Sequence, residues 1–231
     1  MLADPRAVAA RWPEPRPRAL AALTRAVTEA PWELSRADLA RIRDAGLSDD
    51  DVLHAIALAA YFSHLNRIAD AVGVPLDFVV RREPPPPERA IPPFLAAPAP
   101  VTGAPALDLA RREPTATALA AWMEHVARPS PALDGYRRAM IATRVGRLVG
   151  DATGDQAGDA APRAGDAEAI DRALLELADR ITLAPWTLDA ASYAPLRDAG
   201  FTDRDVFDAC VVASSAGVFS RIEVALIALG R

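Results

Sequence analysis

The chain has 231 residues, a formal net charge of −5 and a hydrophobic content of 51%, which suffices for one large or two small domains with a buried core. A chain without basic excess is not expected to have nucleic acid as its main partner. All 26 cationic side chains besides histidine are Arg, which excludes Schiff-base lysines and P-loop lysines, and we expect no cofactor.

Residues 1–12 open the chain with scattered charges and no apolar run, so they do not resemble a signal peptide. The most apolar stretch, residues 206–229, is interrupted by Asp208, Arg221 and Glu223, which favours a buried helix over a membrane span. We therefore expect a cytoplasmic protein without a membrane partner.

The dominant pattern is an internal repeat. Its two segments begin at Pro31 and Pro185, which gives an offset of 154 positions. Residues 31–68 match residues 185–222 without a gap, and the run Arg-Asp-Ala-Gly at 43–46 recurs at 197–200. Chance does not produce a gapless match of this length. We interpret it as the duplication of one helical unit.

Each copy of the unit predicts three helices. In the first copy, helical apolar spacing over 20–29 stops before a proline. A short helix capped by Ser35 then ends at Gly46, because glycine suits the left-handed position after a helix. A long helix follows Ser48 and runs to about residue 72, with acidic residues in its first turn. The corresponding parts of the second copy are 174–183, Asp189, Gly200, Thr202 and 206–229.

The segments between the copies differ in composition. Residues 75–105 are rich in proline and predict an extended linker, whereas residues 151–166 are rich in Gly, Ala and Asp and predict a flexible loop. Residues 114–128 and 131–149 predict helices. We expect three regions: a helical repeat at 1–74, a linker at 75–113 and a C-terminal domain at 114–231.

Four motifs resemble one known family. They are Arg43-Asp-Ala-Gly46, Ser48-Asp-Asp-Asp51, Phe62-Ser-His-Leu-Asn-Arg67 and the segment 129–145. Together they resemble the carboxymuconolactone decarboxylase / alkylhydroperoxidase AhpD-like family over about 19–74 and 119–227. The resemblance implies an all-α fold built on the duplicated unit. It also implies self-association through helix packing, for which a homodimer is the expected form.

The redox motif of that family is replaced in this chain. Active members carry Glu-x11-Cys-x2-Cys-x3-His, in which one thiolate attacks the peroxide and the second thiol resolves the sulfenic acid. Here the four positions are occupied by Ala139, Asp151, Gly154 and Gly158. The resemblance therefore implies the fold but not the peroxidase chemistry.

Polar side chains gather on the long helix of the first copy. His54, Tyr61 and His64 lie at i, i+7 and i+10 on one helical face, close to Asn66 and Arg67. One interpretation is a pocket for an anionic or oxygenated small molecule, with Arg67 and Asn66 as anchors and a histidine as acid or base. The alternative is hydrogen bonding between helices or subunits. Metal binding is not expected, because ten residues separate the two histidines.

The only cysteine, Cys210, cannot form an intramolecular disulfide. It lies opposite Ile56 in the repeat, which predicts a buried and inert thiol; a one-cysteine peroxidase is the alternative. The tryptophans that follow proline in the two copies, Trp32 and Trp186, are expected to anchor the core.

Arg67 and its counterpart Arg221 lie within apolar helices in both copies. A buried arginine needs an acidic or carbonyl partner. We expect a salt bridge inside each unit, and the candidate partners are Asp44 and Asp198, or Asp51 and Asp205.

Two functional hypotheses follow. In the first, the chain is a non-catalytic AhpD-like binding or structural module. In the second, it is an enzyme with a relocated, thiol-independent site around His54, Tyr61, His64 and Arg67. A further alternative is residual alkylhydroperoxidase activity through Cys210. A pocket lined by the four side chains would favour the enzyme, and their dispersal into packed interfaces would favour the module.

Overall fold

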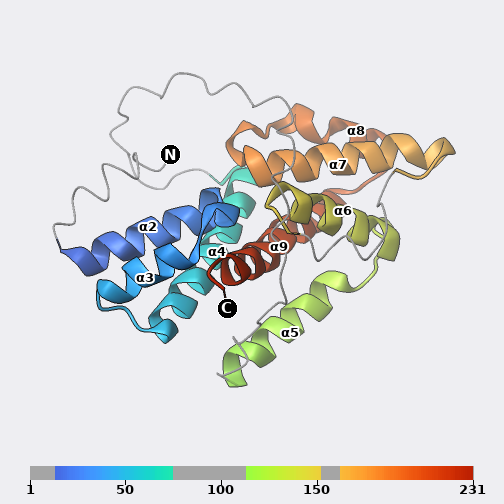
Figure 1. The fold of residues 1–231 in the computed structure, drawn as a ribbon. Helices are drawn as coiled ribbons and strands as arrows, with labels where there is room; N and C mark the ends of the chain where they lie inside the picture. Colours follow the sequence, from blue (N-terminus) through green and yellow to red (C-terminus); the bar gives the residue numbers. More distant parts are fainter. Residues whose placement is uncertain (1–13, 75–112, 152–161, 231) are drawn as a thin grey trace, which may run out of the picture.

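The computed structural model describes residues 14–74, 113–151 and 162–230 (Figure 1). Helices form every regular element in these ranges, and no strand is present among them, so the expected all-α class is confirmed. The N-terminal segment 1–12, nearly all of the expected linker and most of the expected Gly-rich loop lie outside the described residues.

The helices of the first copy begin and end close to the predicted positions. They are α2 (Pro15–Glu29), the 3-10 turn η1 (Pro31–Glu33), α3 (Arg36–Asp44) and α4 (Asp49–Ala71). The middle of the chain forms α5 (Glu113–Ala127), α6 (Gly135–Leu148) and the turn η4 (Gly165–Ala167). The second copy forms α7 (Glu168–Leu183), η5 (Pro185–Thr187), η6 (Ala190–Tyr193), α8 (Ala194–Asp198) and α9 (Asp203–Ala228).

The same local devices place the helix ends in both copies. Ser48 accepts a hydrogen bond from the Asp51 N–H while the Asp51 carboxylate accepts one from the Ser48 N–H, and Thr202 and Asp205 form the same reciprocal cap. Gly46 and Gly200, with φ of +83° and +90°, end the preceding helices in the left-handed conformation that glycine adopts without steric cost.

The two copies differ in the short helix between their caps. In the first copy α3 runs without interruption, whereas in the second copy the corresponding segment is divided into η6 and α8. Pro195 lies in the first turn of α8. Proline has no N–H to donate within a helix, so it is tolerated where a helix begins but not in its interior.

The apolar interior consists of two clusters that share α9, which runs through the middle of the bundle (Figure 1). Residues 206–216 of α9 pack with α6 and α7 in the first cluster, and residues 218–229 pack with α2, α3 and α4 in the second. Fully buried side chains of the two clusters include Met140, Leu174, Val27 and Ile56.

One core prediction is confirmed and another is wrong. Ile56 and Cys210, which correspond in the repeat, are both buried, at 0% and 2% exposure. Trp186, by contrast, is 62% exposed, so it does not anchor the core. The buried residue at each turn is the preceding proline, Pro31 or Pro185.

The long helix α9 has the length and composition that could cross a membrane, but most of its apolar window is buried against other helices of the chain. Its apolar character is therefore explained by the two clusters that it joins, and does not call for a second copy of the chain. The expected homodimer stays a prediction.

Candidate functional site

The polar side chains expected on one face of α4 do not share one environment. His54 is exposed, and its Nδ1 lies 2.8 Å from the Asp50 carbonyl oxygen on the same helix. Tyr61 and His64 instead contact Trp122 of α5. Asn66 is exposed. Tyr61 and His64 therefore share a contact with Trp122, whereas the hydrogen bond of His54 is made within α4.

Trp122 is the centre of this contact. Its ring centroid lies 5.0 Å from that of His64, 5.2 Å from Phe219 and 6.2 Å from Tyr61, in edge-to-face arrangements that suit the charge distribution of aromatic rings. Its Nε1–H donates to Ser215 Oγ at 3.2 Å. Trp122 thus fastens α5 to α4 and α9, a role that the sequence did not indicate beyond placing it on a predicted helix.

His64 is partly buried beneath Trp122. Burial lowers the pKa of His64 below its ordinary value, the nearby charge of Arg67 lowers it further, and the Ser214 carbonyl opposes the shift. Its Nδ1 is buried without a hydrogen-bond partner. His64 is therefore held as a neutral imidazole at neutral pH.

The pKa of His64 predicts how stability depends on pH. The unfolded chain takes up a proton near the ordinary value of 6.5, but the folded chain does so only at lower pH, so the free energy of unfolding should fall as pH decreases below 6.5. Urea titrations at pH 7 and pH 5 should show a smaller loss in His64→Gln than in the wild type. His54→Gln, on the exposed side of the same helix, is the matched control and should keep the wild-type loss. Equal losses in all three proteins would contradict the assignment.

Arg67 and Arg221 bind backbone carbonyls rather than the expected carboxylates. Arg67 donates from Nη1 to Ser63 O at 3.1 Å and to Ser63 Oγ, and from Nη2 to Thr182 O at 3.2 Å. Arg221 donates from Nη1 to Gly217 O at 3.0 Å and from Nε to Thr28 O at 3.3 Å.

The expected salt bridges inside each unit are therefore wrong. Asp51 and Asp205 are engaged in the caps that begin α4 and α9, and Asp44 and Asp198 are exposed. The carboxylates of Asp51 and Asp205 accept hydrogen bonds from the residues that cap their helices, so they do not pair with the two arginines.

The contacts of the two arginines are reciprocal. Thr28 and Thr182 are separated by the repeat offset, and so are Ser63 and Gly217. Each arginine bonds to its own helix one turn earlier and to the end of the first helix of the other copy. One hydrogen bond from each arginine thus joins the two segments that match in sequence, where α4 packs against α9.

Cys210 is not placed for nucleophilic chemistry. Burial raises the pKa of the Cys210 thiol to about 12, so almost none is thiolate at neutral pH. Of the four positions that the family resemblance assigned to the redox motif, Ala139 is exposed on α6 and Asp151 is buried just beyond its end. Gly154 and Gly158 lie outside the described residues.

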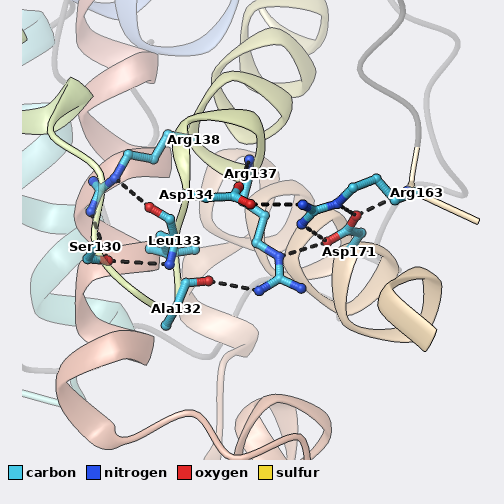
Figure 2. A network of polar contacts seen from close by, with 8 residues as sticks. All are labelled: Ser130, Ala132, Leu133, Asp134, Arg137, Arg138, Arg163 and Asp171. Carbon is cyan, nitrogen blue, oxygen red and sulfur yellow. Dashed lines mark hydrogen bonds and ion pairs between the residues drawn. The ribbon is translucent and has the colours of Figure 1, made fainter. Parts of the chain in front are cut away.

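A second polar cluster, which the sequence did not reveal, joins α6 to α7 (Figure 2). The Asp171 carboxylate is fully buried and accepts from Arg137 Nε at 2.8 Å and from Arg163 Nε at 3.0 Å. Arg163 also donates to Asp134, which caps α6. Burial alone would raise the pKa of Asp171, but the hydrogen bonds from Arg163 and Arg137 outweigh it and lower the pKa below its usual value.

Beside this cluster, Arg138 ties the end of α5 to α6 and α9. It donates to Val126 O at 2.8 Å and Leu133 O at 3.1 Å, and it forms an ion pair with Asp208. Figure 2 shows Ser130 and Leu133 gathered around its guanidinium. Each arginine here is satisfied by carboxylates and carbonyls, so the arrangement is that of a structural brace.

Within the described ranges, no group of three or more His, Cys, Asp or Glu residues lies close enough to hold a metal ion. No family model, no curated protein and no solved structure matches the chain.

Proposed function

We propose that this chain is a divergent AhpD-like helical protein, built on a duplicated unit, that has lost the peroxidase chemistry and acts as a non-catalytic binding module. Three features support the proposal. Two of the motifs that resemble the family, Arg43-Asp-Ala-Gly46 and Ser48-Asp-Asp-Asp51, coincide with the end of α3 and the cap that begins α4. The same caps recur in the second copy at the repeat offset. The reciprocal bonds of Arg67 and Arg221 are those expected where two related units pack about a pseudo-two-fold axis.

The observation that favours a module over an enzyme is the dispersal of the four candidate side chains. His54 bonds to its own helix, Tyr61 and His64 pack against Trp122, and Arg67 binds two backbone carbonyls. General acid–base catalysis needs a nucleophile or a reacting proton within hydrogen-bond reach of the base. Among the described contacts of His64 there is no such group.

Peroxide reduction tests the proposal directly. With cumene hydroperoxide and a thiol reductant, neither the wild type nor Cys210→Ala should show turnover, because the Cys210 thiol is buried and its pKa is raised to about 12. The thiol should also fail to react with Ellman's reagent until the protein is unfolded in denaturant. Wild-type turnover that is lost in a folded Cys210→Ala variant would contradict the proposal and make Cys210 a peroxidatic thiol.

A further inference from the structure

Two arginine side chains lie where α4 packs against α9, Arg221 buried and Arg67 partly buried, and neither has an acidic partner within salt-bridge distance in the described part of the chain. Arg221 is only 4% exposed, and its hydrogen bonds go to the carbonyls of Thr28 and Gly217. The Nε atom of Arg67 is buried and has no acceptor. A buried cation without a counter-ion is costly, because the energy of its lost hydration is not recovered.

The two charges also act on each other. Burial lowers the pKa of Arg221 well below its ordinary value, and the charge of Arg67 lowers it further. Burial likewise lowers the pKa of Arg67 to about 10, and the charge of Asp70, which is exposed and does not form an ion pair with Arg67, opposes this shift. The charge of this pair is therefore not balanced by the described protein groups around it.

The local backbone makes room for the guanidinium groups. A Cβ on Gly217 would lie 2.7 Å from Arg221 Nη1, so a larger residue there would move this guanidinium from its present position. One buried donor, Nε of Arg67, has no partner. The two carbonyl bonds of Arg221 use its Nε and Nη1, so its Nη2 is not engaged by either carbonyl.

We propose that Arg67 and Arg221 together bind one small oxyanion, such as a carboxylate, phosphate or sulfate group, where the two copies of the repeat meet. An oxyanion would accept from the unused guanidinium donors in charge-assisted hydrogen bonds and would remove the repulsion between the two cations. This inference deepens the proposed function, on which it rests, by giving the binding module a ligand class.

The test is binding and thermal unfolding in Tris–chloride buffer, with sodium phosphate, sodium sulfate or sodium benzoate replacing sodium chloride at constant ionic strength. Wild-type protein should bind at least one of the three probes saturably by calorimetry, and its Tm should rise with the concentration of that probe. Phosphate and sulfate against benzoate distinguish an inorganic-type oxyanion from a carboxylate. Absence of saturable binding of all three probes to the wild type would overturn the proposal without any variant.

Arg67→Met and Arg221→Met keep much of the side-chain volume and remove the charge. Each should weaken binding by about tenfold or more, as expected for loss of a hydrogen bond to a charged group. Arg43→Met is the matched control, because Arg43 is exposed and paired with Asp49, and it should bind like the wild type. Equal binding by all three variants would show that the anion binds elsewhere and would overturn the proposal.

The same variants separate ligand binding from a purely structural role. Both variants lose their bonds to the helix carbonyls, so the Tm of each in chloride should lie below that of the wild type. If the arginines bind an anion, this deficit should widen when the anion is added, because binding then stabilises the wild type more than the variants. If they serve only to bond the carbonyls, the deficit will be the same in both buffers, which would contradict the proposal. The peroxidase assay is independent, so turnover there would refute the proposed function and leave the anion result standing.

Discussion

Replacing Asp171 by alanine is expected to lower the free energy of unfolding by about 3–5 kcal/mol, the range for removal of one partner from a buried ion pair. The Asp171 carboxylate is fully buried and joins Arg137 of α6 to Arg163, which precedes α7 (Figure 2). Its removal leaves Arg137, itself largely buried, without a carboxylate. Urea denaturation followed by far-UV circular dichroism at pH 7 measures the loss.

Glu168→Ala is the matched control on the same helix. Glu168 pairs with Arg172 at the surface of α7, and exposed pairs of this kind contribute about 0.5 kcal/mol or less. Because the pKa of Asp171 is lowered in the folded chain, its contribution should be present above the pKa of the unfolded carboxyl and be lost as pH falls below it. Losses of similar size in the two variants would mean that the cluster does not brace α6 against α7.

Replacing Trp122 by alanine is expected to cost about 3 kcal/mol, at the low end of the range for large aromatic core residues because the side chain is partly exposed. The change removes the ring contacts with Tyr61, His64 and Phe219 and the hydrogen bond to Ser215. Loss of the covering ring should also move the pKa of His64 back toward its ordinary value. Denaturation measures the first effect, and a titration of the His64 ring by NMR measures the second.

Trp186→Ala provides the comparison, because Trp186 is 62% exposed. Its replacement should cost well under half as much as that of Trp122, since little apolar surface returns to water. The outcome that would contradict the role of Trp122 is an unchanged pKa of His64 in a Trp122→Ala variant that remains folded.

The local structure of the repeat could be predicted because its signals act over three or four residues. The Ser48 cap, the Thr202 cap and the turn glycines Gly46 and Gly200 each depend on neighbours in the chain, and all four lie as expected. The division of the short helix in the second copy also has a local cause, Pro195. Whether a proline interrupts a helix depends on its position in that helix, and the repeat pattern alone does not give this position.

The tertiary contacts of the candidate site could not be predicted, because they depend on partners distant in the chain. Nothing near Trp122 in sequence indicates that it covers His64. For Arg67 and Arg221, a buried arginine requires acceptors, but the sequence does not say whether these are carboxylates or the carbonyls at the end of a helix. The repeat offset relates the two contacts to each other, since Thr28 and Thr182 correspond through it, but it does not indicate either contact.

The position of α9 has a consequence for how the chain acquires its structure during synthesis. Both apolar clusters include residues of α9, yet α9 follows every helix that it packs against in the described chain. The helices that pack against α9, among them α2, α4, α6 and α7, therefore leave the ribosome before the helix that completes both clusters. We infer that neither cluster can form completely before residues 203–228 are translated. The nascent chain therefore exposes the apolar residues that later contact α9 until this helix emerges.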